Sequence, residues 1–198
     1  MPLFWGINMH IIKHFKTITK HKLVVMKLCF KAGLYKQGLL HDLSKYSFIE
    51  FYNGAKFYQG TCSPNYNERK EKGYSEAWMH HKGRNKHHSE YWIDVNPDSN
   101  CYEPVKMPKR YLAESICDRI AATKIYSGKK FTKDGALNYF YKEKDYIPMH
   151  NDTKLEMERL LILYRDSNEK DFFKYLKKYV KEKEWLNAIM LFTSILCK

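Results

Sequence analysis

Residues 109–126 of the 198-residue chain read KRYLAESICDRIAATKIY and give its clearest helix signal. Apolar and small side chains recur there at helical spacing, and Gly128 follows as a stop signal. Asp118 lies within this apolar stretch, where a carboxylate needs a cation or hydrogen-bond donors. The residue alone leaves two interpretations equally open: a metal ligand, or a salt bridge, for example with Arg119 of a packed neighbour.

Helical patterns also fill most of the chain on either side of this segment. In the N-terminal half, helices are predicted over 11–32, with a stop at Gly33, and over 35–42; a third is opened by the capping box Ser47-x-x-Glu50, and a fourth is capped by Ser75. In the C-terminal half, a helix is predicted over 132–141, another is opened by Thr153-x-x-Glu156 and runs to about 166, and a pair covers 169–196. The polar stretch 60–73 is predicted to be a loop, and three prolines in 96–108 exclude a continuous helix there. No strand alternation of useful length and no internal repeat is present, so the predicted fold is an all-α helical bundle with additional C-terminal helices.

The composition is that of a folded, strongly basic chain. Lys and Arg number 35 against 22 Asp and Glu, and the resulting formal charge of +13 attracts polyanions. Nucleotides, nucleic acid and acidic membrane surfaces would all be attracted by this charge. The charge could equally serve to bind a phosphate-bearing ligand or simply to keep the protein soluble. The apolar segment 185–197 is too short to span a bilayer, and the N-terminus lacks the features of a secretory signal. Five cysteines without a Cys-x-x-Cys pair do not indicate a zinc finger or a disulfide framework, so we expect a cytoplasmic protein with no membrane partner.

An adjacent histidine and aspartate, His41-Asp42, occur in the apolar context QGLLHDLSK, residues 37–45. Taken alone, such a pair is more often an exposed polar pair at a helix end. Polar groups that enter an apolar stretch need partners, however, and a metal ion is one such partner. Lys45 follows Asp42 by about one helical turn, where it could reach an anion held by the metal.

Four histidines fall within nine residues of the segment WMHHKGRNKHHSEYW, residues 78–92. On a continuous helix His81 and His88 would share one stripe and His80 and His87 the next, so one stripe could face a core and the other a cleft. Arg84 adds positive charge of the kind that phosphate binding requires. A basic exposed loop and buried core histidines are the alternatives. The remaining histidines are expected at the surface or in a loop: His10, His14 and His150.

The order of these residues resembles the HD-domain superfamily of metal-dependent phosphohydrolases, and most closely its HD-GYP-type branch. The segment His41-Asp-Leu-Ser-Lys45 is similar to the branch's His-Asp-x-Gly-Lys element, with Ser44 in place of glycine. Asp118-Arg-Ile-Ala-Ala-Thr is similar to the family's final metal-binding Asp and its continuation. The Gly-Tyr-Pro element is absent, so no specificity for cyclic dinucleotides is implied. The resemblance covers roughly residues 21–137, and the whole chain also resembles a group of short HD-like proteins.

The resemblance implies a set of metal ligands and substrate contacts. The ligands are His21, His41, Asp42 and Asp118 for one divalent transition metal ion (Fe, Mn, Zn, Co or Ni) and, with Asp42 as the bridge, His81, His87 and His88 for a second. His80 stays open as an alternative to His81, and His14 as an alternative to His21. Asp42 and Lys45 are the implied catalytic residues, and Lys45 and Arg84 would contact the substrate phosphate.

The implied function is hydrolysis of a phosphate ester or nucleotide by metal-activated water. Residues 1–140 would form the HD-like, metal-binding helical domain, and 141–198 a helical extension packed on it. The partner would be a phosphate-bearing small molecule or nucleotide, and nucleic acid is compatible. The alternative function is a catalytically silent HD-like module that binds nucleotide or nucleic acid through basic and aromatic side chains. A third possibility is a structural partner protein that uses the C-terminal helices.

Overall fold

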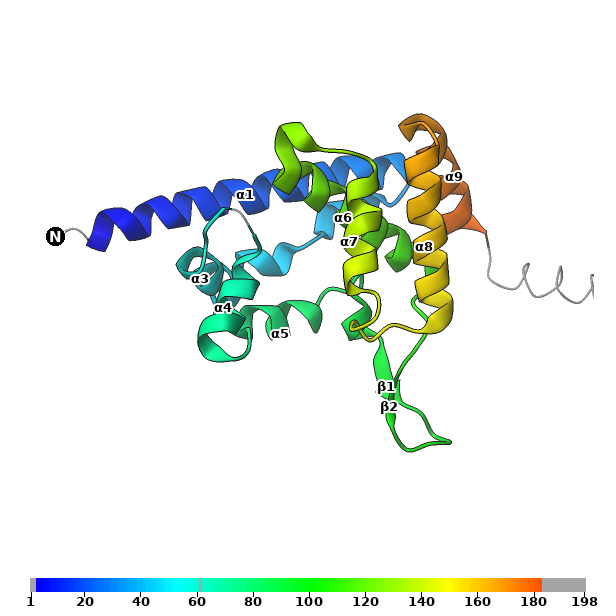
Figure 1. Cartoon of the computed structure of the whole chain (residues 1–198), viewed down its shortest axis with the longest axis horizontal. Coiled ribbons are helices and arrows are strands. Elements are labelled where there is room, and N and C mark those ends of the chain that lie inside the picture. Colours follow the sequence, from blue (N-terminus) through cyan, green and yellow to red (C-terminus); the bar gives the residue numbers. More distant parts are fainter. Residues whose placement is uncertain (1–2, 61, 183–198) are drawn as a thin grey trace, which may run out of the picture.

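The computed structural model describes residues 3–60 and 62–182, with side chains from His10 onward, and it confirms the all-α fold class (Figure 1). The longer helices are α1 (Leu3–Lys31), α3 (Phe48–Lys56), α4 (Pro64–Lys72), α5 (Glu76–Lys82), α6 (Lys109–Ser127), α7 (Asp134–Glu143), α8 (Asn151–Asp166) and α9 (Glu169–Lys181). The shorter elements are α2 (Tyr35–Leu40), the 3-10 turns η1 (Leu43–Tyr46), η2 (Ser89–Tyr91) and η3 (Gly128–Lys130), and the strands β1 (Ile93–Val95) and β2 (Tyr102–Pro104). The second helix predicted after residue 182 lies outside the described residues.

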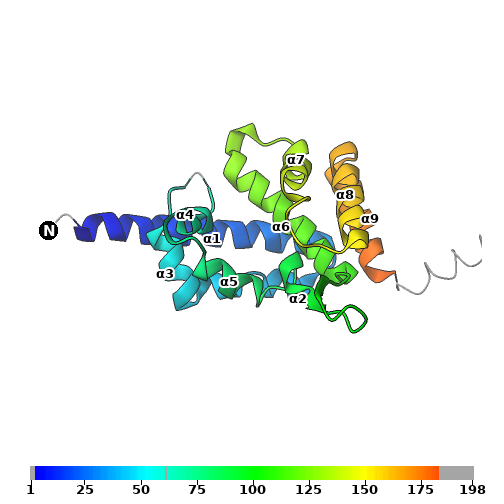
Figure 2. The same cartoon turned by 60° about the horizontal axis from the view of Figure 1, so that its bottom comes forward.

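Helix α1 is the long axis around which the other helices are arranged. Its 29 residues span roughly 43 Å at the usual rise per residue. In Figures 1 and 2, α3 and α4 lie beside its N-terminal half, whereas α6, α8 and α9 gather at its C-terminal half. The helix packs directly on α2, α3, α6 and α9. It therefore connects the two ends of the molecule, and residues near its middle face both groups of helices.

The hydrophobic core lies where α6 packs against α1, α7, α8 and α9. Leu112, Ile116 and Ile120 of α6 are fully buried, and the small residues between them allow neighbouring helices to approach closely. Val25 of α1 and Phe140 of α7 are also fully buried and pack in the same cluster. The core thus accounts for the apolar and small residues that recur along α6.

The stretch 60–73, predicted to be a loop, contains a helix, so that prediction was wrong. Helix α4 starts with Pro64 at its first position, where the missing N–H of proline costs no hydrogen bond. It ends at Gly73, whose φ of 82° is the left-handed conformation that glycine adopts readily. The same proline and glycine that suggested a loop therefore bound a short polar helix between them. Glu68 of α4 is buried and accepts hydrogen bonds from the first residues of α5.

Other predicted helix boundaries also differ from the structure: α1 begins at Leu3 and not at residue 11, and α7 spans Asp134–Glu143 and not 132–141. Helix α2 ends at Leu40 and does not continue through Asp42. Helix α8 begins before Thr153, because the ring of His150 caps it by accepting the N–H of Asp152 at 3.1 Å. The Thr153 hydroxyl instead accepts the N–H of Met107 at 3.0 Å. By contrast, Ser75 caps α5 as predicted, through the N–H of Trp78 at 3.0 Å.

A small antiparallel hairpin interrupts the helices between residues 93 and 104. The two strands pair from Ile93 opposite Pro104 to Val95 opposite Tyr102. Three residues per strand are too few to produce the alternation by which a strand is found in a sequence. The prolines of this region exclude helix, as predicted, and β2 ends at one of them.

His14 is buried, in contrast to the surface position that its place near the N-terminus suggested. Its side chain lies against Phe51 and Tyr58, and Gly54 of α3 faces its imidazole ring. Burial, reinforced by the charge of Lys45, lowers the pKa of His14 to about 4, so the ring is neutral at pH 7. The ring is thus part of the contact between α1 and α3.

We expect Gly54→Ala to destabilise the protein by about 1–3 kcal/mol, because its methyl group would overpack a buried contact. A Cβ at this position would lie 2.3 Å from Nε2 of His14, which is far inside van der Waals distance. Thermal unfolding followed by circular dichroism measures the effect. Gly83→Ala is the matched control, since its new Cβ would approach no atom closer than 3.5 Å. Equal melting temperatures for the two variants would contradict this account of the α1–α3 contact.

Within the residues described, no helix combines the length and the apolar character needed to cross a membrane.

Candidate metal centre

Five separate segments bring the predicted metal ligands together. His21 comes from the middle of α1, His41-Asp42 from the turn after α2, and Asp118 from α6. His81 comes from the last turn of α5, and the pair 87–88 from the segment before η2. Their side-chain atoms form two sets that share Asp42: His21, His41, Asp42 and Asp118 in the first set, and Asp42, His81, His87 and His88 in the second set.

The turn that carries His41 and Asp42 has an unusual backbone conformation. Asp42 has a φ of 53° and a ψ of 27°, in the left-handed region that aspartate and asparagine tolerate better than most residues. The ammonium group of Lys22 donates to the carbonyl oxygens of Leu39 and His41, at 2.8 Å each, and so holds the end of α2. The turn directs the Asp42 carboxylate between the two sets of histidines.

Each oxygen of the Asp42 carboxylate faces a different set. Oδ2 lies 3.3 Å from Nε2 of His41 and 3.9 Å from Nε2 of His21. Oδ1 lies 3.3 Å from Nε2 of His81 and 3.5 Å from Nε2 of His87. Donors placed 2.0–2.2 Å from one ion lie roughly 2.8–3.6 Å from each other. The separations around each oxygen are thus close to those of a metal coordination shell.

Asp118 and His88 complete the two sets. Oδ1 of Asp118 lies 2.8 Å from Nε2 of His21 and 3.6 Å from Nε2 of His41, and its Oδ2 lies 3.8 Å from Nε2 of His87. Asp118 therefore reaches toward both sets. Nε2 of His88 lies 3.0 Å from Nε2 of His81. The alternative interpretation of Asp118, a salt bridge with Arg119, does not hold, because Arg119 pairs with Glu143 instead.

Buried atoms without hydrogen bonds mark the centre of this cluster. Among the described residues, these atoms include Nε2 of His21, His41 and His87 and both carboxylate oxygens of Asp42; none has a hydrogen bond of good geometry, although Lys45 forms an ion pair with one Asp42 oxygen. Leaving buried polar atoms unpaired is costly, and native proteins rarely do so. Imidazole nitrogens and carboxylate oxygens are also the donors that borderline divalent metals prefer. The residues present therefore fit a metal ion, and the cluster could hold one.

Two buried glutamates orient the histidines, and neither was singled out in the sequence. Glu114 of α6 lies 3.0 Å from Nδ1 of His41 and 3.3 Å from Nδ1 of His87. Glu50 of α3 lies 2.6 Å from Nδ1 of His80 and 2.7 Å from Nδ1 of His81. A carboxylate at Nδ1 keeps the proton there, so that Nε2 is free to bind a metal. Glu114 was detectable, because it precedes Asp118 by one helical turn in the same apolar segment.

The histidines that the sequence left as alternatives occupy different positions in the structure. His81 belongs to the second set, whereas His80 belongs to neither and contacts Glu50. His21 belongs to the first set, and His14 does not. Arg84 is exposed and donates to the carbonyl of His80 at 3.1 Å. The stripes predicted for a continuous helix do not exist, because α5 ends at residue 82 before the second histidine pair.

The carboxylates of the cluster are held in the ionised form. Burial would raise the pKa of Asp42, but the charges of His41 and Lys45 hold it well below its ordinary value. Burial would likewise raise the pKa of Asp118, but the imidazoles of His21 and His41 beside its carboxylate hold the pKa well below its usual range. Hydrogen bonds from the paired histidines also overcome burial at Glu114 and lower its pKa. The cluster thus concentrates negative charge around the point that the Nε2 atoms face.

Asp118, Lys45 and His88 are the partly exposed residues of the cluster. The side chains of His41, Asp42, His81 and His87 are at most 3% exposed, whereas those of Asp118 and Lys45 are 18% and 32% exposed. Nζ of Lys45 forms an ion pair with Oδ2 of Asp42 at 2.5 Å. Lys45 thus lies at the more exposed end of the cluster, next to the Asp42 carboxylate.

We expect Glu114→Gln to weaken metal binding by roughly 10- to 100-fold, the usual effect of losing a partner that orients ligands. Both imidazoles contact the same oxygen of Glu114, and the amide oxygen of Gln lacks its negative charge, so His41 and His87 would be held less firmly in their tautomers. Competition with a chromophoric chelator measures the affinity. Glu143→Gln is the matched control, because Glu143 is also buried but pairs with Arg119 away from the cluster. Unchanged affinity in Glu114→Gln would remove the orienting role assigned to this glutamate.

The fold and the cluster together define an all-helical protein with a buried histidine–carboxylate centre able to hold a metal ion. The chain belongs to DUF5662, a family of unknown function, whose family model matches residues 10–162. Comparisons with curated proteins and with solved structures gave no match. The matched region contains every residue of both sets, so the centre lies wholly within the part that defines the family.

Proposed function

We propose that this protein is a metal-dependent phosphohydrolase that cleaves a phosphate ester or a nucleotide. The observation that carries the proposal is the Asp42 carboxylate, which directs one oxygen to each of two histidine sets. A carboxylate between two sets of nitrogen donors suits a pair of divalent ions, an arrangement that recurs in enzymes of phosphate-ester hydrolysis. The order of the ligands along the chain, which resembles the HD-domain superfamily, supports the same proposal.

The ligand chemistry supports a divalent transition metal, with Fe, Mn, Zn, Co and Ni as the candidates. Each set combines imidazole nitrogens with at least one carboxylate, a mixture that suits these ions better than Mg or Ca. His21, His41 and Asp118 would hold one ion, and His81, His87 and His88 the other, with Asp42 shared. Bound there, the metal would supply the Lewis acid that lowers the pKa of water toward about 7.

Lys45 is the residue that we assign to the substrate phosphate. It contacts the Asp42 oxygen that faces the first set, so an incoming cation would displace its ammonium toward solvent. There it would remain at the more exposed end of the cluster and could pair with phosphoryl oxygens. The net charge of +13 would draw an anionic substrate toward this end. Arg84 is on the surface after α5, and we propose it as a second phosphate contact.

Metal content and turnover of the purified full chain test the proposal. We expect at least one equivalent of transition metal by elemental analysis after metal-supplemented purification, and metal-dependent hydrolysis of a phosphodiester, a phosphomonoester or a nucleotide. Lys45→Met should retain the metal but lose turnover by roughly 10²-fold, as for removal of one group that stabilises the transition state. Lys36→Met, in α2, is the matched control and should retain both. Less than half an equivalent of metal would contradict the proposal.

A different outcome would favour a module that binds nucleotide or nucleic acid without hydrolysing it. In that case oligonucleotide binding would be salt-sensitive and unchanged in Asp42→Asn, and no phosphate ester would be cleaved. Part of the aromatic surface that such binding would use is already engaged within the protein. Trp78 packs on the rings of His81 and His88, with centroids 5.6 and 4.8 Å apart. We therefore place hydrolysis first.

A further inference from the structure

Helix α1 has a second apolar stripe, which faces solvent. One side of the helix is buried in the protein through His14, Ile18 and Val25. Ile12, Phe15 and Leu23 lie away from that side and are 54%, 48% and 46% exposed. An exposed apolar residue is ordinary by itself, but a row of them along one helix indicates an interaction surface. We call the region around this row the basic apolar face and define it by Ile12, Phe15, Lys16, Thr19, Lys20, Leu23 and Lys27.

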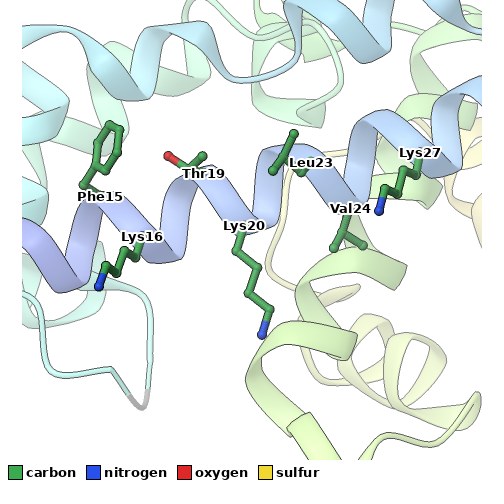
Figure 3. Close-up of a pocket in the computed structure, with 7 residues that line it drawn as sticks. All are labelled: Phe15, Lys16, Thr19, Lys20, Leu23, Val24 and Lys27. Atoms are coloured by element: carbon green, nitrogen blue, oxygen red, sulfur yellow. The ribbon is translucent and has the colours of Figure 1, made fainter.

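The basic apolar face continues from α1 onto the segment after α2. The ring of Phe15 lies 6.1 Å from that of Tyr46, and the hydroxyls of Thr19 and Tyr46 lie 3.1 Å apart. Figure 3 shows Phe15, Thr19 and Leu23 along one side of α1, with Lys16 and Lys20 extending from the other. The lining side chains border a shallow hollow of about 460 Å³. Leu39, Leu40 and Leu43 add further exposed aliphatic surface in the connected α2–η1 segment.

The charge of this region is one-sided. Residues 10–49 contain eight lysines and one acidic residue, Asp42, which is buried in the metal centre. Lys16, Lys20 and Lys27 are exposed and line the same hollow as Phe15 and Leu23. Helices that bind at a membrane surface have this combination, in which lysines contact lipid phosphates and apolar side chains enter the acyl boundary.

In place of the expectation that the protein has no membrane partner, we propose that the basic apolar face binds the surface of an anionic membrane, with the protein remaining on that surface. A second copy of the chain fits poorly, because two such faces would oppose lysines without exposed carboxylates between them. A nucleic acid fits the lysines but not the aliphatic row, because bases stack on aromatic rings rather than on leucine or isoleucine. A lipid surface satisfies both the charge and the aliphatic side chains. The proposal is independent of the chemistry of the metal centre.

Vesicle co-sedimentation of the full chain tests this proposal. We expect binding to vesicles of equal parts phosphatidylcholine and phosphatidylserine, weakening with added salt, and no binding to phosphatidylcholine alone. Replacing Lys16, Lys20 and Lys27 together by Gln should reduce partitioning by about 100-fold, or roughly fivefold for each lysine. The matched control replaces three exposed lysines of α9: Lys170, Lys174 and Lys178. This control variant should retain most of the binding, although its net charge equals that of the α1 lysine variant.

The apolar part of the face has its own variant. Leu23→Gln should reduce partitioning by roughly tenfold, whereas Leu155→Gln, at an exposed position of α8, should not. Circular dichroism and metal content should match the unchanged protein in every variant, because the substituted side chains are exposed. Absence of binding to the anionic vesicles, or equal losses in the α1 and α9 lysine variants, would overturn the proposal. Binding to polyglutamate or an oligonucleotide with the same dependence on Leu23 would also overturn it.

Discussion

Asp42→Asn is expected to lose phosphate-ester hydrolysis by on the order of 10³-fold and to retain less than half of the bound metal. The substitution preserves size and is compatible with the left-handed backbone of residue 42, so the turn should still form. It removes the negative charge shared by the two sets and leaves one oxygen where the structure has two. The second set would lose its only carboxylate and the first would keep Asp118 alone, so both ions would bind more weakly.

Elemental analysis and turnover with a phosphodiester substrate measure this result. Asp98→Asn is the matched control, because Asp98 is an exposed residue of the hairpin loop and the change removes the same charge. Circular dichroism should show the same helix content in both variants. Full activity in Asp42→Asn would show that the carboxylate does not bridge a catalytic pair of ions.

Chelation of the metal is expected to lower the melting temperature by about 10 °C. An ion present at a thousand times its dissociation constant stabilises the folded state by about 4 kcal/mol, and each kcal/mol corresponds to about 2–4 °C for a chain of this size. Removing the ion also leaves the buried, ionised carboxylates of Asp42 and Asp118 without the positive charge of the metal to balance them. Differential scanning calorimetry of metal-loaded and chelated protein measures the shift.

The same chelation experiment carries its own control. Asp42→Asn should melt at nearly the same temperature with and without chelator, because it binds little metal in either case. Adding back Mn or Zn should restore the melting temperature of the unchanged protein. Identical melting curves before and after chelation would mean that metal binding contributes nothing to folding stability, contrary to the arrangement proposed.

The sequence pointed to those residues of the centre whose burial without a partner would be unfavourable. His41, Asp42 and Asp118 stand in apolar segments, so their need for partners could be inferred without knowing the fold. Glu50 was read only as part of a helix cap, and its carboxylate contacts histidines from a segment 30 residues away. Such contacts depend on how α3 packs against α5, and the local sequence pattern contains no information on that packing.

The helices were predicted best where their apolar spacing was strong. Helix α6 begins at residue 109, as predicted, and ends one residue after the predicted boundary. Helix α4 was missed because its residues are almost all polar, and its position depends on Glu68 holding the start of α5. The start of α8 was misplaced because two residues compete for the cap, and Thr153 is used by Met107. Packing thus decided the boundaries that local preferences left undecided.

The position of Glu114 has a consequence for how the centre would fill. This one carboxylate contacts an imidazole of the first set, on His41, and an imidazole of the second, on His87. An ion that binds one set would fix Glu114, and Glu114 would then hold the histidine of the other set in its binding orientation. The second ion would pay less conformational entropy than the first. Loading would therefore be cooperative, and the protein would change from empty to full over a narrow range of metal concentration.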